Sequence, residues 1–148
     1  LLFIWNLTES GHVYRIIKKR HLLFDDRFTK TMCMAITMIS SFVLAFYLEL
    51  LLPANQNFFY LLPIFGGLFI GWKFGSIIKA SDTLNGIYNG TLGGIMGMML
   101  GAVLQNPALC DIPIESGAMI VTNTYSLAIF TACLHALISH FIRYSFKV

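Results

Sequence analysis

The stretch that decides the class of this protein is LNGIYNGTLGGIMGMMLGAVL, residues 84–104. It contains no charged residue, and a helix needs about 20 mostly apolar residues to cross the hydrocarbon core of a membrane. Its glycines form two series with a spacing of four residues, and residues four apart share one face of a helix. The stretch therefore predicts a transmembrane helix with two adjacent faces that lack side chains.

The composition of the whole chain agrees with a membrane protein. Of its 148 residues, 57% are hydrophobic and 11% are charged, whereas a soluble domain has roughly a quarter charged residues. The three cysteines, Cys33, Cys110 and Cys133, form no CxxC pair, so neither a disulfide framework nor a zinc site is expected. These numbers exclude a soluble domain, a disordered tail and a secreted disulfide-rich module.

Three further apolar stretches are long enough to cross a membrane, which predicts an all-α polytopic fold with four transmembrane helices. The spans cover about residues 30–52, 58–78, 84–104 and 117–142. The joins between them are short and rich in turn residues, so sequence neighbours should pack as antiparallel hairpins. Residues 30–148 are thus predicted to form one four-helix transmembrane domain.

Residues 1–29 are predicted to form a separate basic segment. Residues 1–7 are apolar but too short to span, and RIIKKRH follows at residues 15–21 with apolar residues around it. This pattern predicts an interfacial amphipathic helix on the membrane surface. Its cations are expected to bind the headgroups of anionic phospholipids: Arg15, Lys18, Lys19 and Arg20.

The basic residues fall on one side of the predicted membrane domain. All 10 lysines and arginines precede the first span, lie at the join of the second and third spans, or follow the fourth. The other side has Glu49, Asp111 and Glu115. The positive-inside rule places both termini in the cytoplasm, or in the matrix of a mitochondrion. The distribution of the basic residues therefore predicts the topology, and the net charge of +3 does not indicate a nucleic-acid partner.

Ten of the 12 glycines lie between Gly66 and Gly101. Small residues at helical spacing allow helix backbones to approach closely in lipid. The predicted packing surfaces consist of Gly67, Gly71, Gly75, Gly86, Gly90, Gly93, Gly94, Gly97 and Gly101. One face of the third span is expected to meet the second span. The other face packs within the chain or docks on another subunit.

Few residues in the spans suggest chemistry. His135 and His140 are separated by about 140° around a helix, so they cannot bind one ion from the same face. We expect His135 to hydrogen-bond a neighbouring helix, with a ligand role as the alternative. A soft-metal site for Cu(I) is a further alternative to plain packing for the sulfur-rich start of the first span: Met32, Cys33, Met34 and Met38.

The remaining polar residues suggest structural roles. Glu49 and Lys73 are expected to reach their own membrane interfaces, while Asn85 and Asn89 are expected to make a cap or a polar contact. We find no nucleophile–base pair, no paired carboxylates, no phosphate loop and no cluster of metal ligands in the sequence. We therefore expect neither an enzyme nor a cofactor, apart from bound lipid.

The central segment has LLP at residues 51–53, GLFIGWK at residues 67–73, and NGT at residues 89–91 followed by Gly93 and Gly94. In these elements it resembles the TrgA family, small inner-membrane proteins of alphaproteobacteria associated with tellurite resistance. The resemblance covers about residues 30–105 and implies a bacterial-type inner membrane. The basic extension before residue 30 and the region after residue 105 depart from the family.

A weaker likeness is to the Tim17-type four-helix proteins of the mitochondrial inner membrane. Asp82 and Asn85, followed by Gly90, Gly93 and Gly94, are similar to the pattern of those proteins. Both likenesses imply an inner membrane.

The sequence predicts an accessory, non-enzymatic subunit that packs within a larger inner-membrane complex of respiratory or photosynthetic type. The alternative is a small transporter or stress-resistance protein for a tellurite-type oxyanion or a soft metal ion. Transport needs polar groups that converge at the midplane, and the candidates are Ser40, Ser41, Thr131 and His135. A haem- or quinone-binding subunit is a third possibility.

Overall fold

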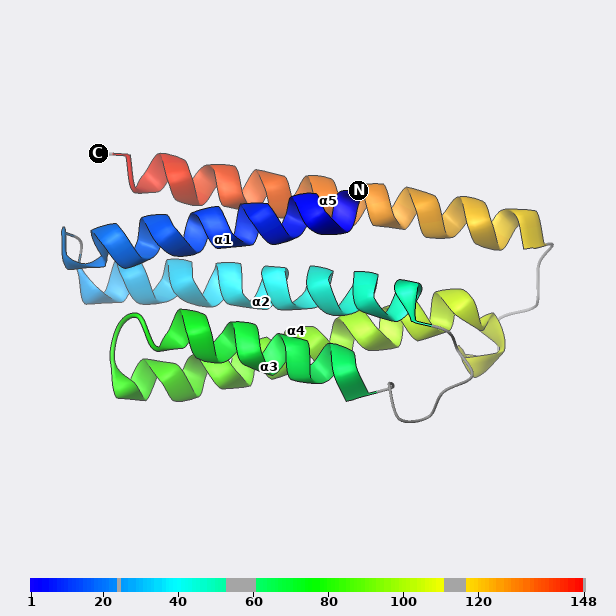
Figure 1. The fold of residues 1–148 in the computed structure, drawn as a ribbon, viewed down its shortest axis with the longest axis horizontal. Helices are drawn as coiled ribbons and strands as arrows, with labels where there is room; N and C mark the ends of the chain where they lie inside the picture. The colour runs from blue at the N-terminus through cyan, green and yellow to red at the C-terminus, as the bar shows by residue number, and fades with distance from the viewer. Residues whose placement is uncertain (24, 53–60, 111–116, 148) are drawn as a thin grey trace.

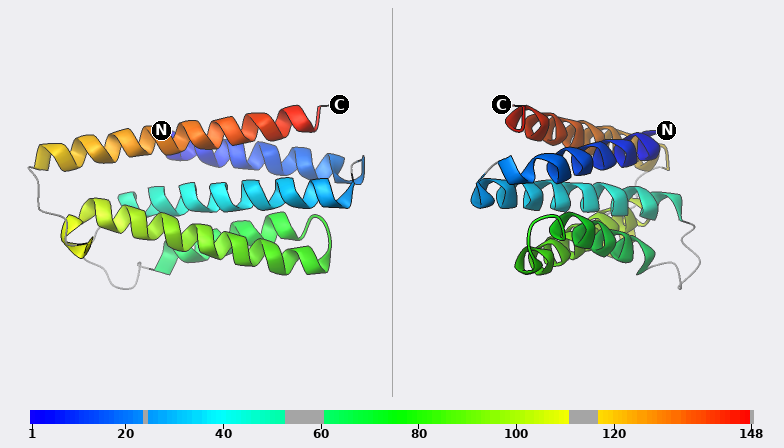
Figure 2. Two further views of the ribbon diagram at one scale, coloured as in Figure 1. Left: turned by 180° about the vertical axis from the view of Figure 1, so that it is seen from behind. Right: turned by 60° about the vertical axis from the view of Figure 1, so that its left-hand side comes forward.

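The computed structural model describes residues 1–148 except 24, 53–60, 111–116 and 148. The described part forms α1 (Leu2–Arg20), α2 (Asp26–Leu51), α3 (Leu62–Gly75), α4 (Ala80–Gln105) and α5 (Gly117–Ser145), with two short 3-10 helices, η1 (His21–Leu23) and η3 (Pro107–Cys110). The five α-helices lie side by side along one axis (Figure 1). α1 lies between α5 and α2, while α3 and α4 cover the other side of α2 (Figure 2). The prediction of an all-α fold is confirmed.

Among the described residues, three helices are long and apolar enough to cross a membrane: α2, α4 and α5. α3 is apolar but has 14 residues, which is about 21 Å of helix against a hydrocarbon core of about 30 Å. The predicted second span starts at residue 58, and its first residues lie outside the described ranges. A membrane protein is thus consistent with the fold, and the fourth span stays a prediction.

Local sequence signals account for two helix ends. Leu52 is extended, with φ −83° and ψ 138°, and it precedes Pro53 in the sequence. The proline ring disfavours a helical conformation of the residue before it, so α2 ends there. Pro63 lies in the first turn of α3, where a backbone N–H would have no partner within the helix.

α1 does not occupy the predicted place. It runs along α2 and α5 instead of crossing the end of the bundle as a surface helix would (Figure 1). Its buried residues are Asn6, Val13 and Ile17. α1 is therefore packed along α2 and α5 rather than separate from them. An amphipathic pattern does not by itself reveal whether its apolar face meets lipid or protein.

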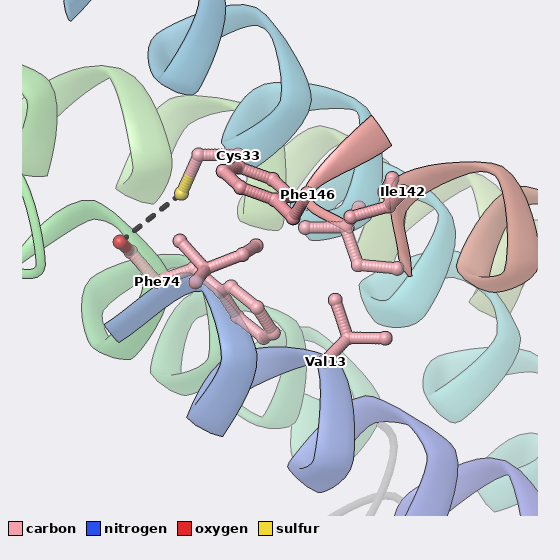
Figure 3. Close-up of a cluster of buried hydrophobic side chains, with 7 residues drawn as sticks. Val13, Cys33, Phe74, Ile142 and Phe146 are labelled. Carbon is pink, nitrogen blue, oxygen red and sulfur yellow. Dashed lines mark hydrogen bonds between the residues drawn. The ribbon is translucent and has the colours of Figure 1, made fainter. Parts of the chain in front are cut away.

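A hydrophobic cluster joins four helices at one end of the bundle. Val13, Cys33, Phe74, Ile142 and Phe146 contribute to it from α1, α2, α3 and the end of α5 (Figure 3). The thiol of Cys33 donates a hydrogen bond to the carbonyl oxygen of Phe74 over 3.2 Å. α5 packs mainly on α1 and α2, so α4 and α5 do not form the closely packed hairpin that we predicted.

The same end of the bundle carries the basic residues. The ends of α1, α3 and α5 and the starts of α2 and α4 lie together there, at the left of Figure 1, and we call it the basic end. Three ion pairs lie near it: Lys30 with Asp82 at 2.7 Å, Lys79 with Asp26, and Arg143 with Glu9. The hydrogen bond and charge of Asp26 raise the pKa of Lys79, but this pair is exposed and adds little stability.

Candidate functional site

α3 and α4 are in close backbone contact through their glycines. A Cβ atom added to Gly67 would lie 2.6 Å from the carbonyl oxygen of Gly90, and one added to Gly90 would lie 2.5 Å from the carbonyl oxygen of Gly67. Gly71 and Gly86 face each other in the same way, and an added Cβ on either would collide with the carbonyl oxygen of the other. The two backbones therefore touch, and no side chain fits between them.

The second glycine face of α4 packs against α2. A Cβ added to Gly93 would lie 2.6 Å from the carbonyl oxygen of Met38, and one added to Gly97 would lie 2.9 Å from the backbone nitrogen of Phe46. The partner of this face is therefore α2 of the same chain rather than another subunit. The spacing of glycines shows that a helix face is smooth, but it does not show which helix will cover it.

The packing of α4 against α2 also buries the side chain of Glu49. A Cβ added to Gly101 would lie 2.8 Å from the Glu49 side chain, and Glu49 is only 6% exposed. The Glu49 side chain is therefore covered by α4, and its position relative to the membrane interface stays a prediction. Lys73 is exposed, and its Nζ lies 5.5 Å from the ring centre of Phe69 and 5.8 Å from that of Trp72.

Four polar side chains meet where α1, α2 and α5 join, and we call them the His135 cluster: Asn6, Ser10, Ser40 and His135. His135 is 0% exposed, Ser40 2% and Asn6 5%. Ser40 lies near the middle of α2, which is long and apolar enough to span a membrane. The cluster is therefore far from both ends of that helix.

The hydrogen bonds determine the tautomer of the neutral His135 ring. Asn6 Nδ2 donates to the carbonyl oxygen of Leu2 over 2.8 Å, which directs Asn6 Oδ1 to His135 Nδ1 at 2.7 Å. An amide oxygen only accepts, so Nδ1 carries the proton and Nε2 is an acceptor in the neutral ring. The Ser40 hydroxyl lies 3.2 Å from Nε2 and donates to it. The Ser10 hydroxyl donates to Ser40 Oγ over 3.2 Å.

A small cavity adjoins the cluster. Its volume is about 10 Å³, and all four members of the cluster line it together with Tyr47. A cavity needs roughly 10–15 Å³ to hold one water molecule. The space beside His135 is therefore large enough for a water molecule and too small for an oxyanion.

The polar face of α5 continues from His135 towards the basic end. Ser139 and Arg143 follow His135 at intervals of four residues, so the three share one side of the helix. Ser139 is fully buried, and its hydroxyl has no hydrogen-bond partner among the described residues. Arg143 forms its ion pair with Glu9 of α1. The interface between α1 and α5 is thus polar halfway along the bundle and charged near its end.

Only two of the residues predicted to converge at the midplane come together. Ser40 joins His135, as expected of a histidine that hydrogen-bonds a neighbouring helix. The hydroxyl of Ser41 donates to the carbonyl oxygen of Gly90 on α4, and that of Thr131 donates to Ala128 of its own helix over 2.9 Å.

Asn6 and Ser10 were missed because residues 1–29 were assigned to the membrane surface. A signal for them exists in the sequence. Asn6, Ser10, Val13 and Ile17 recur at intervals of three and four residues, which places them on one face of a helix. Three of these four residues, Asn6, Val13 and Ile17, are the buried residues of α1.

The members of the sulfur-rich group lie in different surroundings, although Cys33 and Met34 line one small cavity. Cys33 is in the hydrophobic cluster, Met34 accepts a hydrogen bond from Asn85 Nδ2 over 3.6 Å, and Met38 is 38% exposed. Within the described ranges, no three His, Cys, Asp or Glu side chains are grouped so that they could hold a metal ion. Asn89 makes the expected polar contact, donating to Asn85.

Comparisons with known proteins assign no family to this chain. No protein-family model matches it, and neither a curated protein nor a solved structure matches it significantly. We therefore argue function from the geometry of the chain itself.

Proposed function

We propose that this chain is a non-enzymatic accessory subunit of a larger inner-membrane complex of respiratory or photosynthetic type. The outward face of α5 carries the proposal, and we define it as Ser126, Phe130, Cys133 and Leu137. All four side chains are exposed, Phe130 by 61% and Leu137 by 54%. Large and small side chains alternate along this face. In lipid, small and polar residues at helical spacing allow another helix to pack closely and to form interhelical hydrogen bonds.

The proposal includes a topology. We place four spans in the membrane, with the predicted second span extending α3 towards residue 58, and we place the basic end in the cytoplasm or matrix. Two observations support this arrangement. The basic residues lie together at one end of the bundle, as the positive-inside rule requires of one membrane face. Large apolar side chains are exposed along α3, α4 and α5, which lipid can cover.

The subunit proposal predicts a partner in native membranes. After gentle solubilisation, the chain should migrate on native electrophoresis in a species larger than its monomer. A species at the monomer mass alone would contradict the proposal. A photoreactive benzophenone side chain in place of Phe130 should then form a crosslink to another protein. The matched control is Phe69 of α3, which is 53% exposed. Equal crosslinking from both positions would show that the outward face of α5 is not the specific contact.

The His135 cluster favours ion transport as the second candidate function. An ionisable side chain halfway along a membrane bundle, with polar partners from neighbouring helices, is typical of proton relays. The adjoining cavity fits one water molecule. A proton therefore suits this site better than a tellurite-type oxyanion or a soft metal ion.

The transport hypothesis predicts a proton flux that depends on His135. Proteoliposomes with the purified chain should dissipate a pH gradient faster than empty vesicles. His135→Gln should abolish the difference, because the amide keeps hydrogen-bonding capacity but does not titrate near neutral pH. His140→Gln changes an exposed histidine of the same helix and should leave the flux unchanged. The transport hypothesis would be excluded by a wild-type proton flux equal to that of empty vesicles, together with no uptake of tellurite or Cu(I).

A further inference from the structure

A cleft opens at the basic end between the last turns of α1 and α5. Its volume is about 370 Å³, and three cations line it: Arg20, Arg143 and Lys147. Ile16 and Tyr144 form part of its apolar wall. Of the four cations that the sequence singled out for lipid headgroups, only Arg20 lines this cleft.

The charge balance of the cleft is positive. Glu9 neutralises one charge through its ion pair with Arg143. α1 and α5 both end here, and each helix C-terminus adds about half a negative charge. Together these contribute about two negative charges. The three cations exceed them, which leaves a net charge of about +1 for a ligand. Lys147 is exposed and Arg20 is partly exposed, which makes these two cations accessible.

The cleft also offers hydrogen-bond donors. Arg20 Nη1 donates to the carbonyl oxygen of Phe146, and a guanidinium has five N–H donors in total. The Nε atom of Arg143 is buried and has no hydrogen-bond partner among the described residues. Arginine donors of this kind match the oxygens of a phosphate, with which they form charge-assisted hydrogen bonds.

We propose that this cleft binds the phosphate group of an anionic ligand. Arg20 and Lys147 contact the phosphate oxygens, with Arg143 behind them, while Ile16 and Tyr144 face the apolar part of the ligand. A phosphate with an apolar extension is what an anionic phospholipid presents at a membrane interface, where the basic end lies in the proposed topology. A soluble phosphate has the same headgroup chemistry without that extension. The site is independent of any partner on the outward face of α5.

Native mass spectrometry of the purified full chain tests the site. The chain should retain phosphatidylglycerol in preference to phosphatidylcholine. The double variant Arg20→Gln/Lys147→Gln should weaken retention of phosphatidylglycerol about tenfold or more, because it removes two charge-assisted contacts. The control Lys18→Gln/Lys19→Gln removes two exposed positive charges from the same helix end, outside the cleft lining, and should leave retention unchanged.

The possible outcomes distinguish binding in the cleft from a general attraction of anionic lipid to the basic end. Equal losses in the double variant and its control would overturn the proposal, as would equal retention of the two lipids by the wild type. Displacement of phosphatidylglycerol by millimolar inorganic phosphate would support the site and assign it to a soluble phosphate. Retention that survives inorganic phosphate assigns it to the lipid headgroup. If the double variant does not fold, Lys147→Gln alone carries the test, because Lys147 is exposed.

Discussion

Gly71→Ala is expected to destabilise the chain by about 1–3 kcal/mol or more, the usual cost of forcing extra atoms into a packed core. The added methyl group would collide with the carbonyl oxygen of Gly86, and it would lie 3.1 Å from the Cα atom of Gly90. Both obstacles are backbone atoms of α4. They cannot rotate away as a side chain can, so the two helices must move apart.

Gly11→Ala is the matched control, because it makes the same chemical change in α1. A Cβ atom at Gly11 would have no neighbour within 4 Å. Alanine has the higher helix propensity, so this variant should be neutral or more stable by up to about 1 kcal/mol. Gly94→Ala should lie between the two, because its nearest neighbour would be 3.4 Å away, an ordinary contact distance.

The stability of each purified variant can be measured in detergent by monitoring its unfolding with circular dichroism as temperature or denaturant is raised. The order of stability should be Gly11→Ala, then Gly94→Ala, then Gly71→Ala. A Gly71→Ala variant as stable as the Gly11→Ala variant would show that α3 and α4 are not in backbone contact.

The second large effect is expected for His135→Leu. This change removes the partner of the Asn6 amide oxygen and of the Ser40 hydroxyl inside the bundle. A buried polar group left without a partner costs about 1–3 kcal/mol, so the loss of two partners should cost about 2–6 kcal/mol of stability in total. His140→Leu changes an exposed histidine and should have little effect in the same unfolding measurement.

A double variant distinguishes the lost hydrogen bonds from lost packing. Asn6→Leu/His135→Leu removes both members of the closest hydrogen bond in the cluster, and replacing both partners by apolar groups is often nearly neutral. Its cost should be smaller than the sum of the two single changes. Costs that simply add would show that Asn6 and His135 do not interact. A His135→Leu variant as stable as the wild type would contradict the cluster itself.

The two roles considered for His135 give different results for one conservative variant. If the cluster only holds α1, α2 and α5 together, His135→Gln should change stability and nothing else. If it conducts protons, the same variant should lose flux even when it remains folded. Measuring both quantities on one preparation therefore decides between structure and transport.

The sequence by itself predicted the helical class, the candidate spans α2, α4 and α5, and the gathering of basic residues at one end. These features follow from the hydropathy, charge and spacing of residues within one segment. The spacing of the glycines also predicted smooth faces on α4. The spans and the smooth faces belong to single helices and need no knowledge of their neighbours, whereas the gathering of the basic residues follows from the order of the spans along the chain.

Only the tertiary structure decided which helices cover those faces. It showed that α3 and α2 cover the two glycine faces of α4 and that α1 packs against α2 and α5. It also brought Asn6 to His135 across 129 residues of sequence. The physical reason is that an apolar, small or polar face specifies what kind of surface it can meet, whereas the identity of that surface depends on how distant segments pack.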